Sequence, residues 1–143
     1  MWIIFALSAS LFWGVSYVLS EQIYKKISVF TSLGIAFLVV SIISIVISYF
    51  NNSLKSDLVS IYSSKNLLWY VIGGIVALMI AESCIGLSIV SKNATLAGLI
   101  EISYPIFIAI FSYLLFNNKV TLPTILGGIM IFLGVFVIYY FNH

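Results

Sequence analysis

Long apolar stretches separated by short polar segments make up almost the whole chain. A membrane-spanning helix needs roughly 20 predominantly apolar residues, and five stretches approach or reach that length: 2–19, 29–50, 67–90, 94–116 and 122–141. Helices are favoured because every backbone polar group in lipid must find its partner inside the segment. The continuous runs also lack the alternation of transmembrane β-strands. The pattern therefore predicts an all-α integral membrane protein, with five transmembrane helices in a single domain over 1–143.

Composition supports this pattern and excludes several classes of protein. Hydrophobic residues make up 63% of the chain and charged residues 7%, against roughly 25% charged in soluble domains. The net charge is +2 and arginine is absent, so no basic face for nucleic acid is expected. A single cysteine, Cys84, excludes an intramolecular disulfide and a Cys-based metal site, and the only histidine is His143. We therefore expect no enzyme activity, no metal and no cofactor.

The longest connection, 51–66, leaves two structural interpretations open. It carries apolar residues at helical spacing, namely Leu54, Leu58, Ile61 and Tyr62. This spacing is typical of a short amphipathic helix that lies on the membrane surface. The alternative is an unstructured loop.

Lysines are evenly divided between the two sides of the predicted membrane protein. One side carries Lys55, Lys65 and Lys119, and the other carries Lys25, Lys26 and Lys92. Lysines in cytoplasmic loops normally decide orientation, so this balance predicts almost no orientation bias. One interpretation is dual topology, in which copies insert both ways and pair antiparallel. The other is that a weak bias, such as the N-terminal amine or loop distances, still decides.

Two acids lie inside the predicted spans, at similar depths. Glu82 precedes Val90 by about 12 Å and Glu101 follows Ala94 by about 10.5 Å, at 1.5 Å per helical residue. A tight connection joins the two spans, so both carboxyls are predicted near the midplane of a ~30 Å hydrocarbon core. Ionisable residues there are costly and usually functional. A carboxyl pair that titrates as a unit could exchange a proton for a cationic substrate. Alternatively, each Glu stays protonated and bonds a neighbouring helix.

Four other residues are candidates for the same site. Pro105 cannot donate to the carbonyl of Glu101, so that carbonyl is predicted to be freed. An ordinary proline kink is the alternative. Trp13, Tyr17 and Tyr104 could present aromatic faces to a cation, with Tyr104 one turn from Glu101. Packing is the alternative for all three aromatic residues.

Three stretches resemble EamA-type transporters of the drug/metabolite transporter superfamily. They are Leu11–Tyr17, which contains a Trp-Gly pair, Glu101–Phe107, which contains a proline, and Tyr113–Thr121, which leads into the glycine-rich stretch Leu126–Val135. Asn118 departs from the pattern, because the family usually has Glu before its last helix. Small multidrug resistance relatives carry their essential Glu within the first helix, whereas Glu21 lies only at the end of the first span here.

The resemblance implies an architecture and an activity. Typical family members have ten helices in two inverted five-helix repeats with the substrate site between them, a general plan among transporters. This chain supplies one repeat, which favours an antiparallel homodimer in the cell membrane. We expect export or exchange of a metabolite, amino acid or cationic drug against protons, by alternating access. The alternatives are half of an obligate heterodimer, a channel, and a membrane assembly or regulatory subunit that transports nothing.

Overall fold

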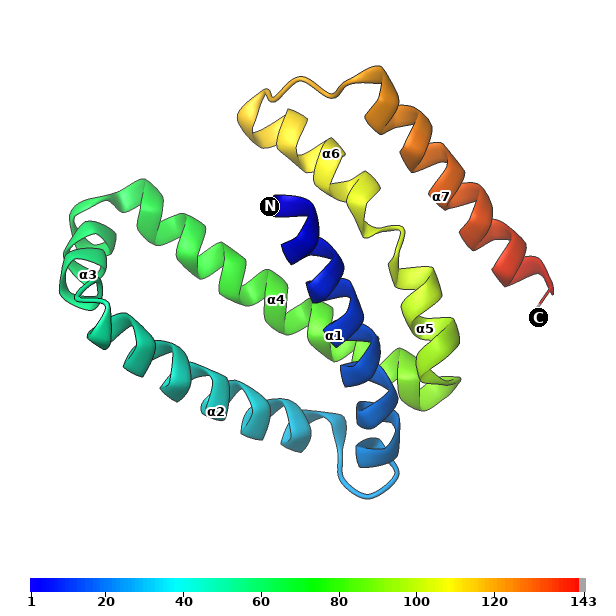
Figure 1. The fold of residues 1–143 in the computed structure, drawn as a ribbon, viewed down its shortest axis with the longest axis horizontal. Coiled ribbons are helices and arrows are strands. Elements are labelled where there is room, and N and C mark those ends of the chain that lie inside the picture. Colours follow the sequence, from blue (N-terminus) through cyan, green and yellow to red (C-terminus); the bar gives the residue numbers. More distant parts are fainter. Residues whose placement is uncertain (142–143) are drawn as a thin grey trace. The chain divides into compact units, whose positions relative to one another are not determined.

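The computed structural model describes residues 1–141 as a chain of helices (Figure 1); His143 lies outside the described residues. In order, the helices are α1 (Trp2–Tyr24), α2 (Val29–Phe50), α3 (Leu54–Ser63), α4 (Lys65–Ser91), α5 (Ala94–Glu101), α6 (Tyr104–Phe116) and α7 (Leu122–Phe141). Five segments are long and apolar enough to cross a membrane, the fourth of them formed by α5 and α6 together. The predicted all-α fold with five spans is confirmed.

The helices differ from the sequence-based expectation at the end of α1 and within the fourth span, and α3 decides between the two alternatives for 51–66. α1 continues beyond residue 19 to Tyr24, because hydropathy marks the apolar part of a helix and not its polar end. The connection 51–66 contains the helix α3, so the unstructured alternative is wrong. The fourth stretch is two helices, with Ile102 and Ser103 between them.

The chain divides into two compact units, which are described separately. The first contains Met1–Glu21 and the chain from Ser88 onward, and the second contains Gln22–Leu87. The single domain expected over 1–143 stays a prediction.

In the second unit, α4 packs closely against the beginning of α2. Ser28 caps α2, because its hydroxyl accepts a hydrogen bond from the Thr31 N–H at 3.2 Å. The next residue, Val29, is buried. Its Cγ1 occupies the space that a Cβ on Gly86 of α4 would need, and the Tyr24 hydroxyl would lie 3.3 Å from that Cβ. The absence of a side chain at Gly86 is therefore what lets the two helices meet.

Replacing Gly86 by alanine is expected to destabilise the protein in detergent. Alanine favours a helix interior over glycine by about 1 kcal/mol, whereas overpacking a close contact costs about 1–3 kcal/mol. Gly74→Ala is the matched control, because a Cβ there meets no atom within 4 Å on the same helix. Thermal unfolding should place Gly86→Ala below Gly74→Ala. Equal melting temperatures for the two variants would contradict the close contact.

In the first unit, α5 and α6 run beside α7 (Figure 1). Gly128 of α7 lies close to α6, since a Cβ there would be 3.3 Å from Ile106 Cγ1. An apolar groove of about 720 Å³ separates parts of α6 and α7, with Pro105, Ala109 and Gly127 in its lining. The groove therefore begins at the first turn of α6.

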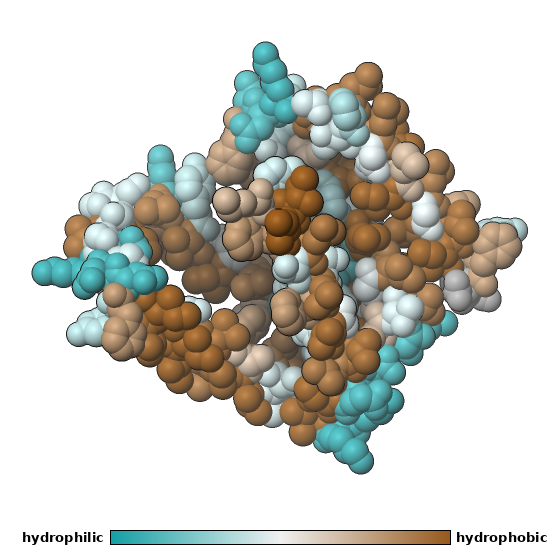
Figure 2. Space-filling model, viewed as in Figure 1, coloured by the Kyte–Doolittle hydropathy of each residue, from teal (hydrophilic) through white to brown (hydrophobic). Residues whose placement is uncertain are grey.

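Most apolar side chains in both units point outward. Within residues 1–141, four apolar residues are buried: Val29, Ile89, Ala94 and Ala97. Figure 2 shows hydrophobic residues along the helices and hydrophilic residues gathered at helix ends and connections. This distribution suits surfaces that face lipid, because hydrocarbon does not drive apolar side chains together as water does.

Candidate functional site at the break in the fourth span

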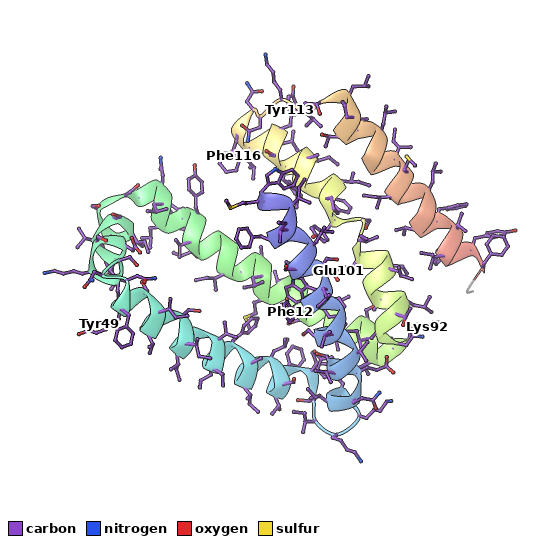
Figure 3. The ribbon with its side chains drawn as sticks, viewed as in Figure 1. Phe12, Tyr49, Lys92, Glu101, Tyr113 and Phe116 are labelled. Carbon is purple, nitrogen blue, oxygen red and sulfur yellow. The ribbon has the colours of Figure 1, made fainter. Side chains whose placement is uncertain are left out.

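The fourth span is interrupted immediately after its acidic residue. Asn93 caps α5, because its side-chain oxygen accepts from the Leu96 N–H at 2.8 Å. The helix ends at Glu101, which Figure 3 labels where the ribbon leaves α5. After Ile102 and Ser103, Pro105 lies in the first turn of α6, where its missing N–H is tolerated. The proline that was expected to free the Glu101 carbonyl therefore accompanies a break between two helices rather than a kink in one.

The lengths of the two pieces place this break within the bilayer. α5 has 8 residues and α6 has 13, which correspond to about 12 Å and about 20 Å. Neither piece alone crosses a hydrocarbon core of ~30 Å. Irregular backbone at this depth is tolerated where protein buries it or where it lines a polar cavity.

A hydroxyl from α1 binds the carboxyl group at the break. The Tyr17 hydroxyl donates to Glu101 Oε2 at 2.5 Å, in a partly buried contact between residues 84 positions apart. The Trp13 ring lies one turn away on α1, with its centroid 5.6 Å from that of Tyr17 and the two planes inclined by 55°. The structure therefore brings together three predicted site residues: Trp13, Tyr17 and Glu101.

Small residues on α5 allow this approach. A Cβ on Gly98 would lie 3.2 Å from Tyr17 Cδ2 and 3.6 Å from Cε2. Ala94 and Ala97, on the same helix, are buried. The small residues let the backbones come close, which places the phenol of Tyr17 against α5 within reach of Glu101.

A second acid holds the other end of α5. Glu21 Oε2 accepts a hydrogen bond from the Ala94 N–H at 2.7 Å. A carboxylate there satisfies a donor that the helix itself leaves unpaired, and it is favoured by the helix dipole. Since Glu21 contacts residue 94 and Tyr17 contacts residues 98 and 101, α1 and α5 run antiparallel, and α1 holds α5 at both ends.

The other predicted site residues lie elsewhere. Tyr104 begins α6 with its side chain 55% exposed, and Pro105 is half-buried beside the groove between α6 and α7. Glu82 lies on α4 in the second unit. The predicted pairing of Glu82 with Glu101 therefore stays a prediction.

Sequence reasoning missed two contributors, Glu21 and Gly98. Trp13, Tyr17 and Glu21 are four residues apart and share one face of α1. Gly98 lies three residues before Glu101, on the matching face of α5. The spacing of these residues could have indicated that the two helix faces meet. Glu21 was set aside because its position is at the end of the span, although its side chain is long enough to reach α5.

The arrangement is suited to binding a proton or a cation. Glu101 offers a carboxylate, Tyr17 a hydroxyl that donates to it, and Trp13 an aromatic ring beside the phenol. Within residues 1–141, no group of three His, Cys, Asp or Glu side chains is placed to hold a metal ion.

Comparison with known proteins gives one match. The model of the EamA-like transporter family matches residues 1–140. Neither the curated proteins nor the solved structures include a match to the chain.

Proposed function

Because this chain belongs to the EamA-like transporter family, we propose that it exchanges a small solute for protons across the cell membrane. The family suggests a membrane transporter of small molecules. The finer proposal is export or exchange of a metabolite, amino acid or cationic drug, by alternating access. The observation that carries it is the Tyr17–Glu101 hydrogen bond at the break in the fourth span.

This hydrogen bond supports coupling between solute movement and proton movement, because the proton and a cation would compete for the Glu101 carboxyl group. An ionisable residue inside a membrane span is costly unless it is paired, and such residues mark ion and substrate pathways. Glu101 can hold a proton, or it can bind a cation as a carboxylate, and the two occupants exclude each other. Such exclusive binding is what an antiporter requires. Tyr17 donates to Glu101 Oε2, and this bond is strongest when Glu101 is a carboxylate.

Glu82, in the second unit, is proposed as a further acid inside the membrane. Its predicted depth matches that of Glu101, and ionisable residues at that depth are usually functional. Trp13, Tyr17 and Tyr104 would then present aromatic faces to a cationic substrate, while Pro105 maintains the break.

An antiparallel homodimer is the proposed assembly. One five-helix repeat with balanced lysines would reproduce the two inverted repeats on which many transporters are built. Reporter fusions at the C-terminus test this proposal, with one reporter active only inside the cell and another active only outside. We expect signal from both. Signal from one alone would exclude an antiparallel homodimer and direct the search to an oppositely oriented partner chain.

The transport proposal is tested with purified protein in vesicles that enclose a pH-sensitive dye. Outward and inward proton gradients are imposed, and amino acids, small metabolites and organic cations are added in turn. We expect at least one solute to move protons across the membrane in the opposite direction. A current that passes without solute exchange would identify a channel. No solute movement in either gradient would favour the membrane assembly or regulatory subunit.

A further inference from the structure

α3 is a short helix joined to a candidate membrane span at each of its ends. Asn52, with a left-handed φ of 56°, and Ser53 make the turn after α2. The turn is closed by hydrogen bonds between the Ser53 N–H and the Ser48 carbonyl, at 3.1 Å, and between the two hydroxyls, at 2.9 Å. Only Ser64 separates α3 from α4. Figure 1 shows α3 nearly end-on between the two long helices, so it runs crosswise to both.

One side of α3 carries an exposed stripe that is mostly apolar. Leu58, Val59 and Tyr62 are 46%, 60% and 82% exposed, and exposed Lys55 lies one turn before them. Together with Ser63, these four residues line a shallow hollow of about 450 Å³. The stripe is therefore a concave apolar surface with a cation at one end.

The serine hydroxyl groups of α3 already have hydrogen-bond partners within the protein. The hydroxyls of Ser56 and Ser60 on the polar side, and of Ser63 at the edge of the hollow, donate to backbone carbonyls of residues 53, 56 and 60, at 2.8, 2.9 and 3.2 Å. Asp57, in the first turn, is the acid of this helix, where the helix dipole favours a negative charge. Because the serine hydroxyls are already paired, the helix can lie in the headgroup region without leaving those donors unsatisfied.

We propose that the stripe of Lys55, Leu58, Val59 and Tyr62 binds an anionic phospholipid at the membrane surface. α3 lies between two candidate membrane spans, so its apolar stripe would face lipid. The Lys55 ammonium lies on the same stripe, where it meets the phosphate of a lipid whose glycerol and upper acyl chain cover Val59 and Tyr62. Free phosphate would leave that apolar surface exposed to water. The proposal concerns lipid binding alone and does not depend on which solute is transported.

The test uses the full chain in vesicles, with one fluorescent label at a time. Cys84 is the only cysteine, so Cys84→Ala provides a cysteine-free background. Bimane is attached at Val59→Cys, on the stripe, or at Ser60→Cys, on the polar side. The vesicles contain nitroxide-bearing lipid in both leaflets, which makes quenching independent of insertion direction. Vesicles in which phosphatidylcholine carries the nitroxide are compared with vesicles in which the same fraction of labelled lipid is phosphatidylglycerol.

We expect strong quenching at residue 59, weak quenching at residue 60, and more quenching at 59 when phosphatidylglycerol carries the nitroxide. Lys55→Gln should reduce this anionic-lipid response about fivefold, the effect of one lysine near an anionic surface. Size-exclusion profiles identify any variant that has not folded. Equal quenching at the two positions would overturn the proposal. A response unchanged by Lys55→Gln would overturn the assignment of the phosphate to Lys55.

Discussion

Glu101→Gln is expected to abolish solute-driven proton movement while the protein still inserts and folds. Glutamine keeps the size of the side chain, and its amide oxygen can still accept from the Tyr17 hydroxyl, which donates to Glu101 in the structure. The amide cannot take up or release a proton, so the exchange between proton and cation is lost. Solute counterflow without a gradient separates lost coupling from lost binding, because counterflow needs no net proton movement.

Two variants in the contact between α1 and α5 show whether the transport loss expected for Glu101→Gln is caused by the missing carboxyl group. Glu21→Gln should leave proton movement nearly intact, because an amide oxygen can still accept the Ala94 N–H that Glu21 binds. Tyr17→Phe should reduce transport about 10- to 100-fold, since a hydrogen bond to a charged group contributes about 1.5–3 kcal/mol. If Glu101→Gln transports normally, or if Glu21→Gln loses as much transport activity as Glu101→Gln does, the assignment of Glu101 as the proton carrier is contradicted.

Gly98→Val is expected to separate α1 from α5 and to impair both stability and transport. The Cβ of valine would lie 3.2 Å from the Tyr17 ring, with two further methyl groups beyond it. Overpacking of this kind costs about 1–3 kcal/mol. The displaced ring carries its hydroxyl away from Glu101, so transport should fall by about the 10- to 100-fold expected for loss of that hydrogen bond.

Gly14→Val is the matched control for this prediction. Gly14 lies on α1 in the same unit, and a Cβ there meets no atom within 4 Å. Both substitutions place a β-branched residue in a helix, so the loss of helix propensity is shared and cancels in the comparison. Thermal unfolding and transport are measured on both proteins at a temperature where each is folded. Similar behaviour of the two variants would show that the Tyr17 ring does not depend on Gly98.

The five spans and their helical form could be predicted because hydropathy and backbone hydrogen bonding act along the chain. The break at Ile102 and Ser103 could not, because neither residue forbids a helix. Pro105 signalled an interruption, but it is compatible with both a kink and a new helix. The carbonyl that Pro105 leaves without a helical partner is that of Glu101, and the structure resolves this by starting α6 afresh.

The contacts of the site were predictable only in part. Glu101 and Tyr17 stood out as polar groups in apolar helices, but their pairing depends on which helix faces meet. That choice is made by close packing, through Gly98 and Ala97, whose significance a single sequence does not reveal. Glu21 was set aside because its Cα lies at a span end, although its carboxylate reaches the first residue of α5.

Attachment at two points restricts the mechanics of α5. The helix α5 is about 12 Å long. Because it is hydrogen-bonded to α1 through Glu21 near one end and through Tyr17 near the other, it can neither slide along α1 nor swing away from it. The remaining degrees of freedom are the backbone torsions of Ile102 and Ser103. Ile102 and Ser103 therefore form a joint between α5 and α6, while α7, which lies beside both helices, restrains how far they can move apart. Rotation about this joint, rather than translation, would therefore decide which face of the membrane Glu101 meets.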